Sequence, residues 1–478
     1  MGNISLKHRT LKSMIWNAVQ RFGSIGIYFL ANIILVRLID PEVFGSIGIL
    51  LIFVSISTSI VDGGFSSALI QQKNIKQVDY STVFYWSIVA SLVMMCIIWL
   101  VSPIVAEYYN TPILNKVLRV QSVLFLFHAL GVVQNAKLTK ELSFRTLATR
   151  NIIASASGAV IAVVMAYNGY GIWSIVAQEL VMAIVGTTLL WISCKWIPTL
   201  EFSRSSFLRM FKFGSYVFLS TIIDTLYRNV QSLIIGRRFS MMELGYYTQA
   251  RKLENVPIDS ASSVVASVLF PALSSINNDY DRLKMVVRKS ISVVTFASFP
   301  AMLLLAIVGE QIILFLYGAE WSASIPMYQI LCLGSMFYML NVCNATIFKI
   351  IGEGRVYFIL QTVKRVVCLV LLLLSVKYGL FVLLWTTSLT QIVMYAINMV
   401  YTHRVFKYTY REQLKDIVPN LIITLCCGIL TIIVMCNFEF DSNILSIIIN
   451  ATVYSIFYYV LSRLFKTQSL QYVASMLK

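Results

Sequence analysis

The sequence predicts an all-α integral membrane protein with about 14 transmembrane helices: two parallel six-helix lobes followed by two C-terminal helices. Three observations favour this class. Apolar stretches of about 20 residues recur along the whole chain of 478 residues. Lys and Arg residues collect in every second gap between these stretches. The second half of the chain also partly repeats the first.

The apolar stretches are long enough to cross a bilayer as helices. A hydrocarbon core about 30 Å thick requires roughly 20 helical residues. We expect spans beginning near the following residues: Met14, Gly45, Val83, Val117, Thr146, Gly171, Phe213, Tyr246, Arg288, Ala323, Tyr357, Leu380, Ile417 and Asn443.

The basic residues predict the orientation of these spans. If the chain enters the first span from the cytoplasm, about 26 of the 38 Lys and Arg residues lie in cytoplasmic gaps and about six lie outside. We therefore expect cytoplasmic N- and C-termini and a place in the bacterial inner membrane. The net charge of +17 then faces anionic lipid headgroups, which argues against nucleic acid as a partner.

The loops and motifs argue against an enzyme. The longest gaps, residues 195–212 and 403–416, are too short to hold a soluble catalytic domain. The chain has no Walker-type glycine loop, no H-E-x-x-H motif and no nucleophile elbow. Its eight Cys residues have no metal-ligand spacing. We expect no catalytic residue, no metal and no cofactor.

An internal repeat predicts the domain organisation. The segment 32–45 aligns with 232–245, so that Arg37 matches Arg237 and Gly45 matches Gly245. Six predicted spans separate the two copies, and an even number gives both the same orientation in the membrane. We expect an N-terminal lobe at 1–200, a C-terminal lobe at 201–405 and a helix pair at 406–478.

Polar side chains recur on single faces of several predicted spans. An ionisable group that faces lipid costs several kcal/mol, so such groups normally face a cavity or a partner. The basic members are Arg21, Arg228, Arg251, Lys252, Lys364 and Arg365. The acidic members include Asp62, Asp224 and Asp259, and the uncharged ones include Asn17, Tyr28, Gln231 and Asn255.

The basic residues of this set outnumber the acidic ones, so a cavity that they line would favour an anion. An Arg guanidinium matches the oxygens of a phosphate, and a low dielectric strengthens that pairing. A structural alternative remains open, in which the charges neutralise each other in buried pairs, such as Asp224 with Arg228 or Arg251 with Glu254. Lys364 and Arg365 could instead extend to the cytoplasmic interface.

Four segments resemble a known family. They are WNAVQRFGSIGIYFLANIILVRLIDPEVFGSIGILLIFVSISTSIVDGGFSSALIQ, DYSTVFYWS, QNAKLTKELSF and GYYTQARKLENVP. These segments are similar to the Wzx-type lipopolysaccharide and exopolysaccharide flippases. That family is the polysaccharide transporter branch of the multidrug/oligosaccharidyl-lipid/polysaccharide (MOP) export superfamily.

The resemblance implies two six-helix lobes that form a V around a central cavity, with two extra helices. It also implies movement of an undecaprenyl-diphosphate-linked oligosaccharide from the cytoplasmic to the periplasmic leaflet by alternating access. The resulting surface polysaccharide would be an O-antigen, a capsule or an exopolysaccharide. The implied partners are this substrate and membrane lipids, with the polymerase and chain-length regulator of the same pathway as further candidates.

Within that mechanism the polar residues receive expected roles. The six basic residues Arg21, Arg228, Arg251, Lys252, Lys364 and Arg365 would line the cavity and bind the diphosphate. Asn17, Tyr28, Gln231 and Asn255 would face the sugar hydroxyls. Asp62, Asp224 and Asp259 are candidates for coupling to protons or sodium.

Two other classes remain open. A polytopic glycan polymerase or ligase also handles lipid-linked glycans, but it normally needs a large periplasmic loop, and the outer gaps here are short. A multidrug antiporter of the same superfamily is the second alternative. Ion-coupled dye efflux that survives loss of the cavity arginines would identify it.

Overall fold

The computed structural model describes residues 2–274, 280–350, 354–436, 438, 442–465 and 467–477, and these residues form an all-helical chain. Contacts divide it into two compact units, Met1–Gly245 and Tyr246–Lys478. The division into residues 1–200, 201–405 and 406–478 that the sequence predicts stays a prediction.

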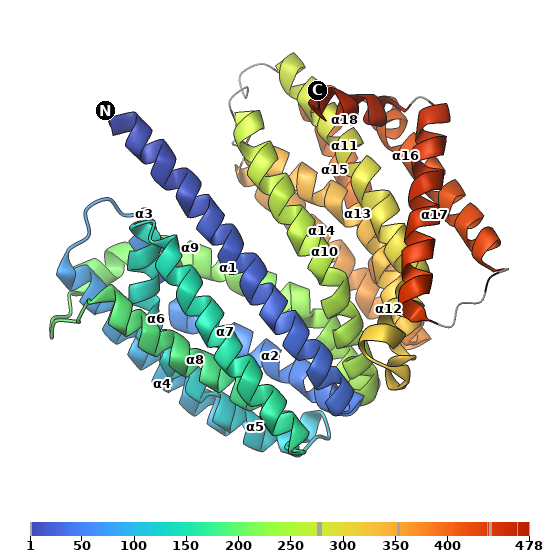
Figure 1. Cartoon of the computed structure of the whole chain (residues 1–478). Coiled ribbons are helices and arrows are strands. Elements are labelled where there is room, and N and C mark those ends of the chain that lie inside the picture. Colours follow the sequence, from blue (N-terminus) through green and yellow to red (C-terminus); the bar gives the residue numbers. More distant parts are fainter. Residues whose placement is uncertain are drawn as a thin grey trace. The chain divides into compact units, whose positions relative to one another are not determined.

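The first unit contains nine helices within its described residues, coloured blue to green in Figure 1. They are α1 (Gly2–Leu38), α2 (Pro41–Asp62), α3 (Phe65–Gln71), α4 (Gln77–Tyr108), α5 (Ile113–Gln121), α6 (Val123–Lys140), α7 (Phe144–Tyr167), α8 (Ile172–Cys194) and α9 (Arg204–Arg238). Helix α7 packs between α1 and α8, α6 packs against α4 and α8, and α9 lies against α2, α3 and α4.

The second unit begins inside α10 (Met241–Ser274). It continues with α11 (Tyr280–Ile307), α12 (Gly309–Leu316), η1 (Ala319–Trp321), α13 (Ser324–Ile350), α14 (Gly354–Ser375), η2 (Val376–Tyr378), α15 (Leu380–Phe406), α16 (Tyr410–Met435), α17 (Asn443–Leu464) and α18 (Gln468–Leu477). Helix α13 packs between α11 and α15, α11 also contacts α16 and α18, and α14 packs on α15.

Each expected span start falls in or within one residue of a long helix, with α5 and α6 together forming the fourth. Within the described residues, 11 helical segments are long and apolar enough to cross a membrane. Helix α9 and the described part of α10 lack such an apolar stretch, and the described apolar part of α1, Phe22–Leu38, is shorter. These three helices carry most of the polar residues that the sequence singles out, which is why their hydropathy is weaker.

Helix boundaries follow the internal repeat. Helix α1 ends at Leu38 and α9 at Arg238, while α2 begins at Pro41 and α10 at Met241, so both boundaries recur after 200 residues. This offset is the one at which the sequence aligns with itself. Both copies of the helix pair therefore turn at the same place.

Helices α2 and α10 meet at a pair of glycines that the repeat equates. A Cβ atom at Gly45 would lie 1.9 Å from the Met241 carbonyl oxygen, and one at Gly245 would lie 1.8 Å from the Pro41 carbonyl oxygen. Pro41 and Met241 are themselves repeat partners, so the contact is reciprocal. Only glycine permits this approach of the two backbones.

Gly45→Ala and Gly245→Ala should each destabilise the protein, because the added methyl group overlaps backbone that cannot rotate away. Overpacking of this kind costs about 1–3 kcal/mol. Thermal unfolding of the purified protein, followed by fluorescence-detected size exclusion, measures the loss. Gly26→Ala is the control, since a Cβ there has no neighbouring heavy atom within 4 Å. Unchanged melting of both test variants would contradict the tight crossing.

Candidate functional site

The polar residues of the first unit lie on α1, α2 and α9. The side chains of Asn17 and Arg21 lie outside the described part of the chain, although both residues belong to α1. Tyr28 is half-buried near Glu179 of α8. This places one polar group of α1 near an acidic residue of α8.

Asp62 lies at the last residue of α2 and organises the turn into α3. Its carboxylate accepts hydrogen bonds from the Ser66 hydroxyl and from the Gly64 backbone N–H, the latter at 3.2 Å. Those bonds fix the carboxylate in the turn. Its expected role in ion coupling stays a prediction.

On α9 the expected residues differ in exposure. Asp224 is half-buried, Arg228 is exposed and Gln231 is buried. The spacing of Asp224 and Arg228 would allow an ion pair within the helix, but no such pair occurs among the ion pairs of the described residues. An exposed guanidinium in a membrane protein must face water, a headgroup or a partner.

Helix α10 contains the most developed site of the second unit. Arg251 Nη1 lies 3.1 Å from Glu254 Oε2, with the two side chains three residues apart on the helix. The Arg251 side chain is 42% exposed, whereas the Glu254 side chain is 0% exposed. The Arg251–Glu254 ion pair, which the sequence analysis gave as a structural alternative, therefore exists. Its two side chains differ in exposure: Glu254 is enclosed, whereas Arg251 is partly exposed.

A neighbouring helix completes this site. The hydroxyl of Ser335, on α13, donates a hydrogen bond to Glu254 Oε1. Glu254 Oε2 accepts no hydrogen bond in the described chain, so its contact with Arg251 is electrostatic. The remaining expected residues of α10 surround this pair in sequence: Lys252 and Asn255 are half-buried, and Asp259 is exposed.

Lys364 lies on α14 and is only 4% exposed. Cys368, Leu372 and Ser375 continue the same buried face of the helix. The next residue, Arg365, is half-buried. Burial of Lys364 argues against the alternative in which it extends to the cytoplasmic interface.

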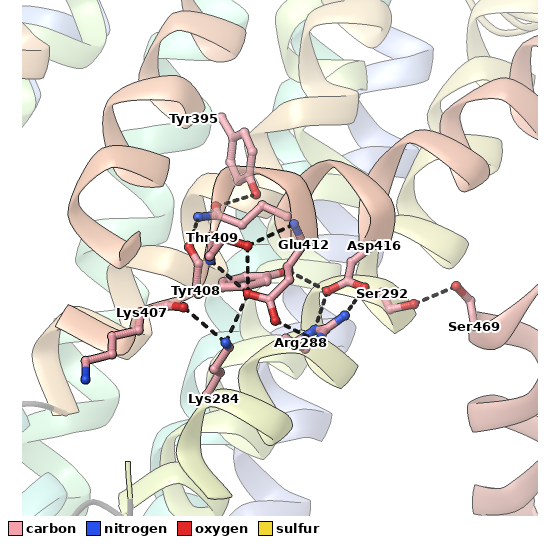
Figure 2. Close-up of polar contacts among 11 residues, drawn as sticks. Lys284, Arg288, Ser292, Tyr395, Lys407, Tyr408, Thr409, Glu412, Asp416 and Ser469 are labelled. Carbon is pink, nitrogen blue, oxygen red and sulfur yellow. Dashed lines mark hydrogen bonds and ion pairs between the residues drawn. The ribbon is translucent and has the colours of Figure 1, made fainter. Parts of the chain in front are cut away.

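A second polar cluster of the same unit has its charges balanced. Figure 2 shows Arg288 of α11 facing Asp416 of α16, with Nε–Oδ2 and Nη2–Oδ1 distances of 2.8 and 2.9 Å. Glu412 accepts from Arg288 at 3.3 Å and from Lys284 at 3.0 Å. Two cations thus neutralise two acids.

The surroundings of this cluster indicate a structural role. The Tyr408 hydroxyl donates to Asp416 at 2.7 Å, and burial of the phenol, with that hydrogen bond, raises the pKa of Tyr408 above its ordinary value. Near the cluster, Ser469 of α18 contacts Ser292 of α11 and Asn420 of α16. The charged network therefore joins α11 and α16, with polar contacts to α18 beside it, and leaves little charge for a ligand.

The sequence analysis missed Ser335 and gave Glu254 only as a pairing partner. The one available signal for Glu254 was its spacing of three residues from Arg251, which places both on one helix face. Ser335 carried no signal, because it is 81 residues away from Glu254.

The helical fold is similar to that of solved membrane proteins. It is similar to that of the lipid II flippase MurJ in an inward closed conformation, with a TM-score of 0.75 at 16% identity over 95% of this chain and 98% of that one. An inward-facing multidrug resistance MATE transporter of the MOP superfamily gives a TM-score of 0.62 at 16% identity, covering 83% and 98%.

The family model described as "Polysaccharide biosynthesis protein" matches residues 34–326, and the chain belongs to this family of bacterial multi-pass membrane transporters, which are not enzymes. Succinoglycan biosynthesis transport protein ExoT of Rhizobium meliloti (strain 1021) is 28% identical over 345 residues, 72% of this chain and 69% of ExoT. Lipopolysaccharide biosynthesis protein WzxC of Escherichia coli (strain K12) is 27% identical over 331 residues, 69% and 67%. The resemblance to Wzx-type flippases is confirmed.

Asp416→Asn should destabilise the protein without removing a ligand contact. The change leaves Arg288 without its bidentate partner, and breaking a buried pair costs about 3–5 kcal/mol, less here because Arg288 is 32% exposed. We expect a lower melting temperature and a lower protein level in the membrane. Asp40→Asn is the matched control, since Asp40 is exposed and makes no side-chain cap hydrogen bond to α2. Equal melting of the two variants would contradict the structural role.

Proposed function

We propose that the protein is a flippase that moves an undecaprenyl-diphosphate-linked oligosaccharide from the cytoplasmic to the periplasmic leaflet for surface polysaccharide biosynthesis. The observation that carries the proposal is Arg251: a cation on a polar helix, held beside an enclosed acid while its side chain as a whole is 42% exposed. Such a group suits an anionic headgroup. The names of the relatives, which include succinoglycan, lipopolysaccharide and teichuronic acid biosynthesis, support a glycan-linked substrate.

The proposed architecture has 14 spans: the 11 apolar segments together with α1, α9 and α10. Two parallel six-helix lobes would form a V around a central cavity, followed by α16 and α17 as the extra pair. Both termini would lie in the cytoplasm, and the protein would reside in the inner membrane. The repeated helix boundaries and the likeness to MOP-type folds support this arrangement.

In the proposed mechanism, arginines hold the diphosphate while the lobes alternate between two openings. Arg21, Arg228 and Arg251 would contact the phosphates, with Lys252, Lys364 and Arg365 adding positive charge. Asn17, Tyr28, Gln231 and Asn255 would contact sugar hydroxyls. The polyprenyl tail would remain in lipid. Inside-negative potential favours outward movement of the anion by about 2.3 kcal/mol per charge per 100 mV.

Asp62, Asp224 and Asp259 remain the proposed sites at which an ion could couple to transport. Asp259 is exposed and Asp224 is half-buried, while the Asp62 carboxylate accepts hydrogen bonds in the turn between α2 and α3.

The test is deletion of the protein in its native host, followed by assay of long-chain surface glycan and of the leaflet that holds undecaprenyl-linked units. A flippase predicts loss of polymer with intact units trapped on the cytoplasmic side. Units that reach the periplasm but stay unpolymerised would instead identify a polymerase or ligase. Normal polymer with lost ion-coupled dye efflux would identify a multidrug antiporter.

Arg251→Ala should reduce polymer output by about tenfold or more, because a charge-assisted contact to phosphate contributes about 1.5–3 kcal/mol. Arg251→Lys should recover part of the output, since Lys keeps the charge but not the planar fork. Complementation of the deletion strain measures both. Arg21→Ala and Arg228→Ala should also reduce output.

Two further variants separate binding from stability. Arg238→Ala removes an exposed arginine at the end of α9 and should leave output unchanged. Arg251→Ala alone leaves Glu254 as a buried acid without its ion-pair partner, which would destabilise the protein. The double variant Arg251→Ala, Glu254→Gln also removes the buried negative charge. Normal output from the double variant at normal protein level would rule out a role for Arg251 in binding the diphosphate.

A further inference from the structure

Glu254 depends on a single cation. Its side chain is fully enclosed, Ser335 satisfies Oε1, and Arg251 provides the only ion pair that the described residues give to Oε2. Removing the partner of a buried charge is strongly destabilising, because the remaining charge has neither water nor a counter-charge. The ionised state of Glu254 is therefore tied to the position of Arg251.

Arg251 is the same group that we propose to bind the diphosphate. Its side chain is 42% exposed, and its contact with Glu254 Oε2 lacks hydrogen-bond alignment. A diphosphate diester carries two negative charges near neutral pH and offers better-aligned oxygens to the guanidinium fork. The headgroup and Glu254 thus compete for one cation.

From this arrangement we propose that Glu254 is a proton-binding residue, which takes up a proton when an anionic diphosphate headgroup draws Arg251 away. The proton comes from hydronium: the carboxylate and H₃O⁺ become the carboxylic acid and water, with the new O–H bond at Oε2. Ser335 keeps its hydrogen bond to Oε1. This inference rests on the proposed function, and it deepens that function by adding a proton to the binding step.

The groups around Glu254 favour this exchange. Helix α10 contributes Tyr247 and Asp259 besides Arg251, and the packed face of α13 contributes Tyr328 and Cys332. Tyr338 of α13 lies near Arg251. Arg251 is the one cation among these groups, so none of them can replace it beside Glu254. A bound diphosphate would also repel the carboxylate, and protonation removes that repulsion.

The exchange predicts linkage between proton and headgroup binding. If binding takes up one proton, affinity falls as pH rises, by up to tenfold per pH unit where the free protein is ionised and the complex is protonated. At pH low enough for the free protein to be protonated already, the dependence disappears. Glu254→Gln imitates the protonated acid, so its affinity should not follow this pH dependence.

Calorimetry on the purified full-length protein tests the proposal. The probe is citronellyl-diphospho-N-acetylglucosamine, a diester whose phosphates hold no proton near neutral pH. Titration in two buffers of different ionisation enthalpy counts the protons taken up. We expect about one proton for each probe molecule bound by the wild-type protein, and none for Glu254→Gln with equal or tighter binding.

Glu310→Gln is the matched control, since Glu310 is an exposed carboxylate in the first turn of α12. It should take up the wild-type number of protons. Wild-type binding with the same enthalpy in both buffers and no pH dependence would overturn the proton exchange while leaving the flippase proposal intact. If Glu254→Gln does not fold, the wild-type pH series still decides. A wild-type protein that binds no probe would overturn the proposed function itself.

Discussion

An ionisable side chain within a membrane costs several kcal/mol unless it meets water, a headgroup or a counter-charge. The described chain answers this constraint in two ways. Around Arg288, two cations pair with two acids, and these ion pairs join α11 and α16. At Arg251 only the acid is enclosed, while the cation remains accessible. The same ion-pair chemistry thus balances the charges in one place and leaves a partly exposed cation in the other.

The internal repeat gives the fold a second constraint. Helices α2 and α10 approach so closely that only glycine fits at positions 45 and 245. Gly45 contacts Met241, and Gly245 contacts Pro41, which occupies the matching position in the first copy. Because backbone packs directly on backbone at this crossing, no side-chain rotation could make room for a larger residue at either glycine.

The sequence predicted the helices well because hydropathy and basic residues report directly on membrane crossing. The internal repeat stays a prediction, although the ends of α1 and α9 and the starts of α2 and α10 lie 200 residues apart. Side-chain environments were harder to predict. Burial of Glu254 depends on α13, and Ser335 lies 81 residues away from it, while Arg288 and Asp416 are 128 residues apart. Such contacts arise from packing between helices, which periodicity within one helix cannot show.

Transbilayer movement by the purified protein is the most direct test of the proposed function. Proteoliposomes would contain a fluorescent polyprenyl-diphospho-oligosaccharide, and a membrane-impermeant quencher would report the fraction in the outer leaflet over time. We expect rapid exchange with the wild-type protein and little with the double variant Arg251→Ala, Glu254→Gln. Exchange no faster than in protein-free vesicles, under an imposed potential and an imposed proton gradient, would contradict the assignment as a flippase.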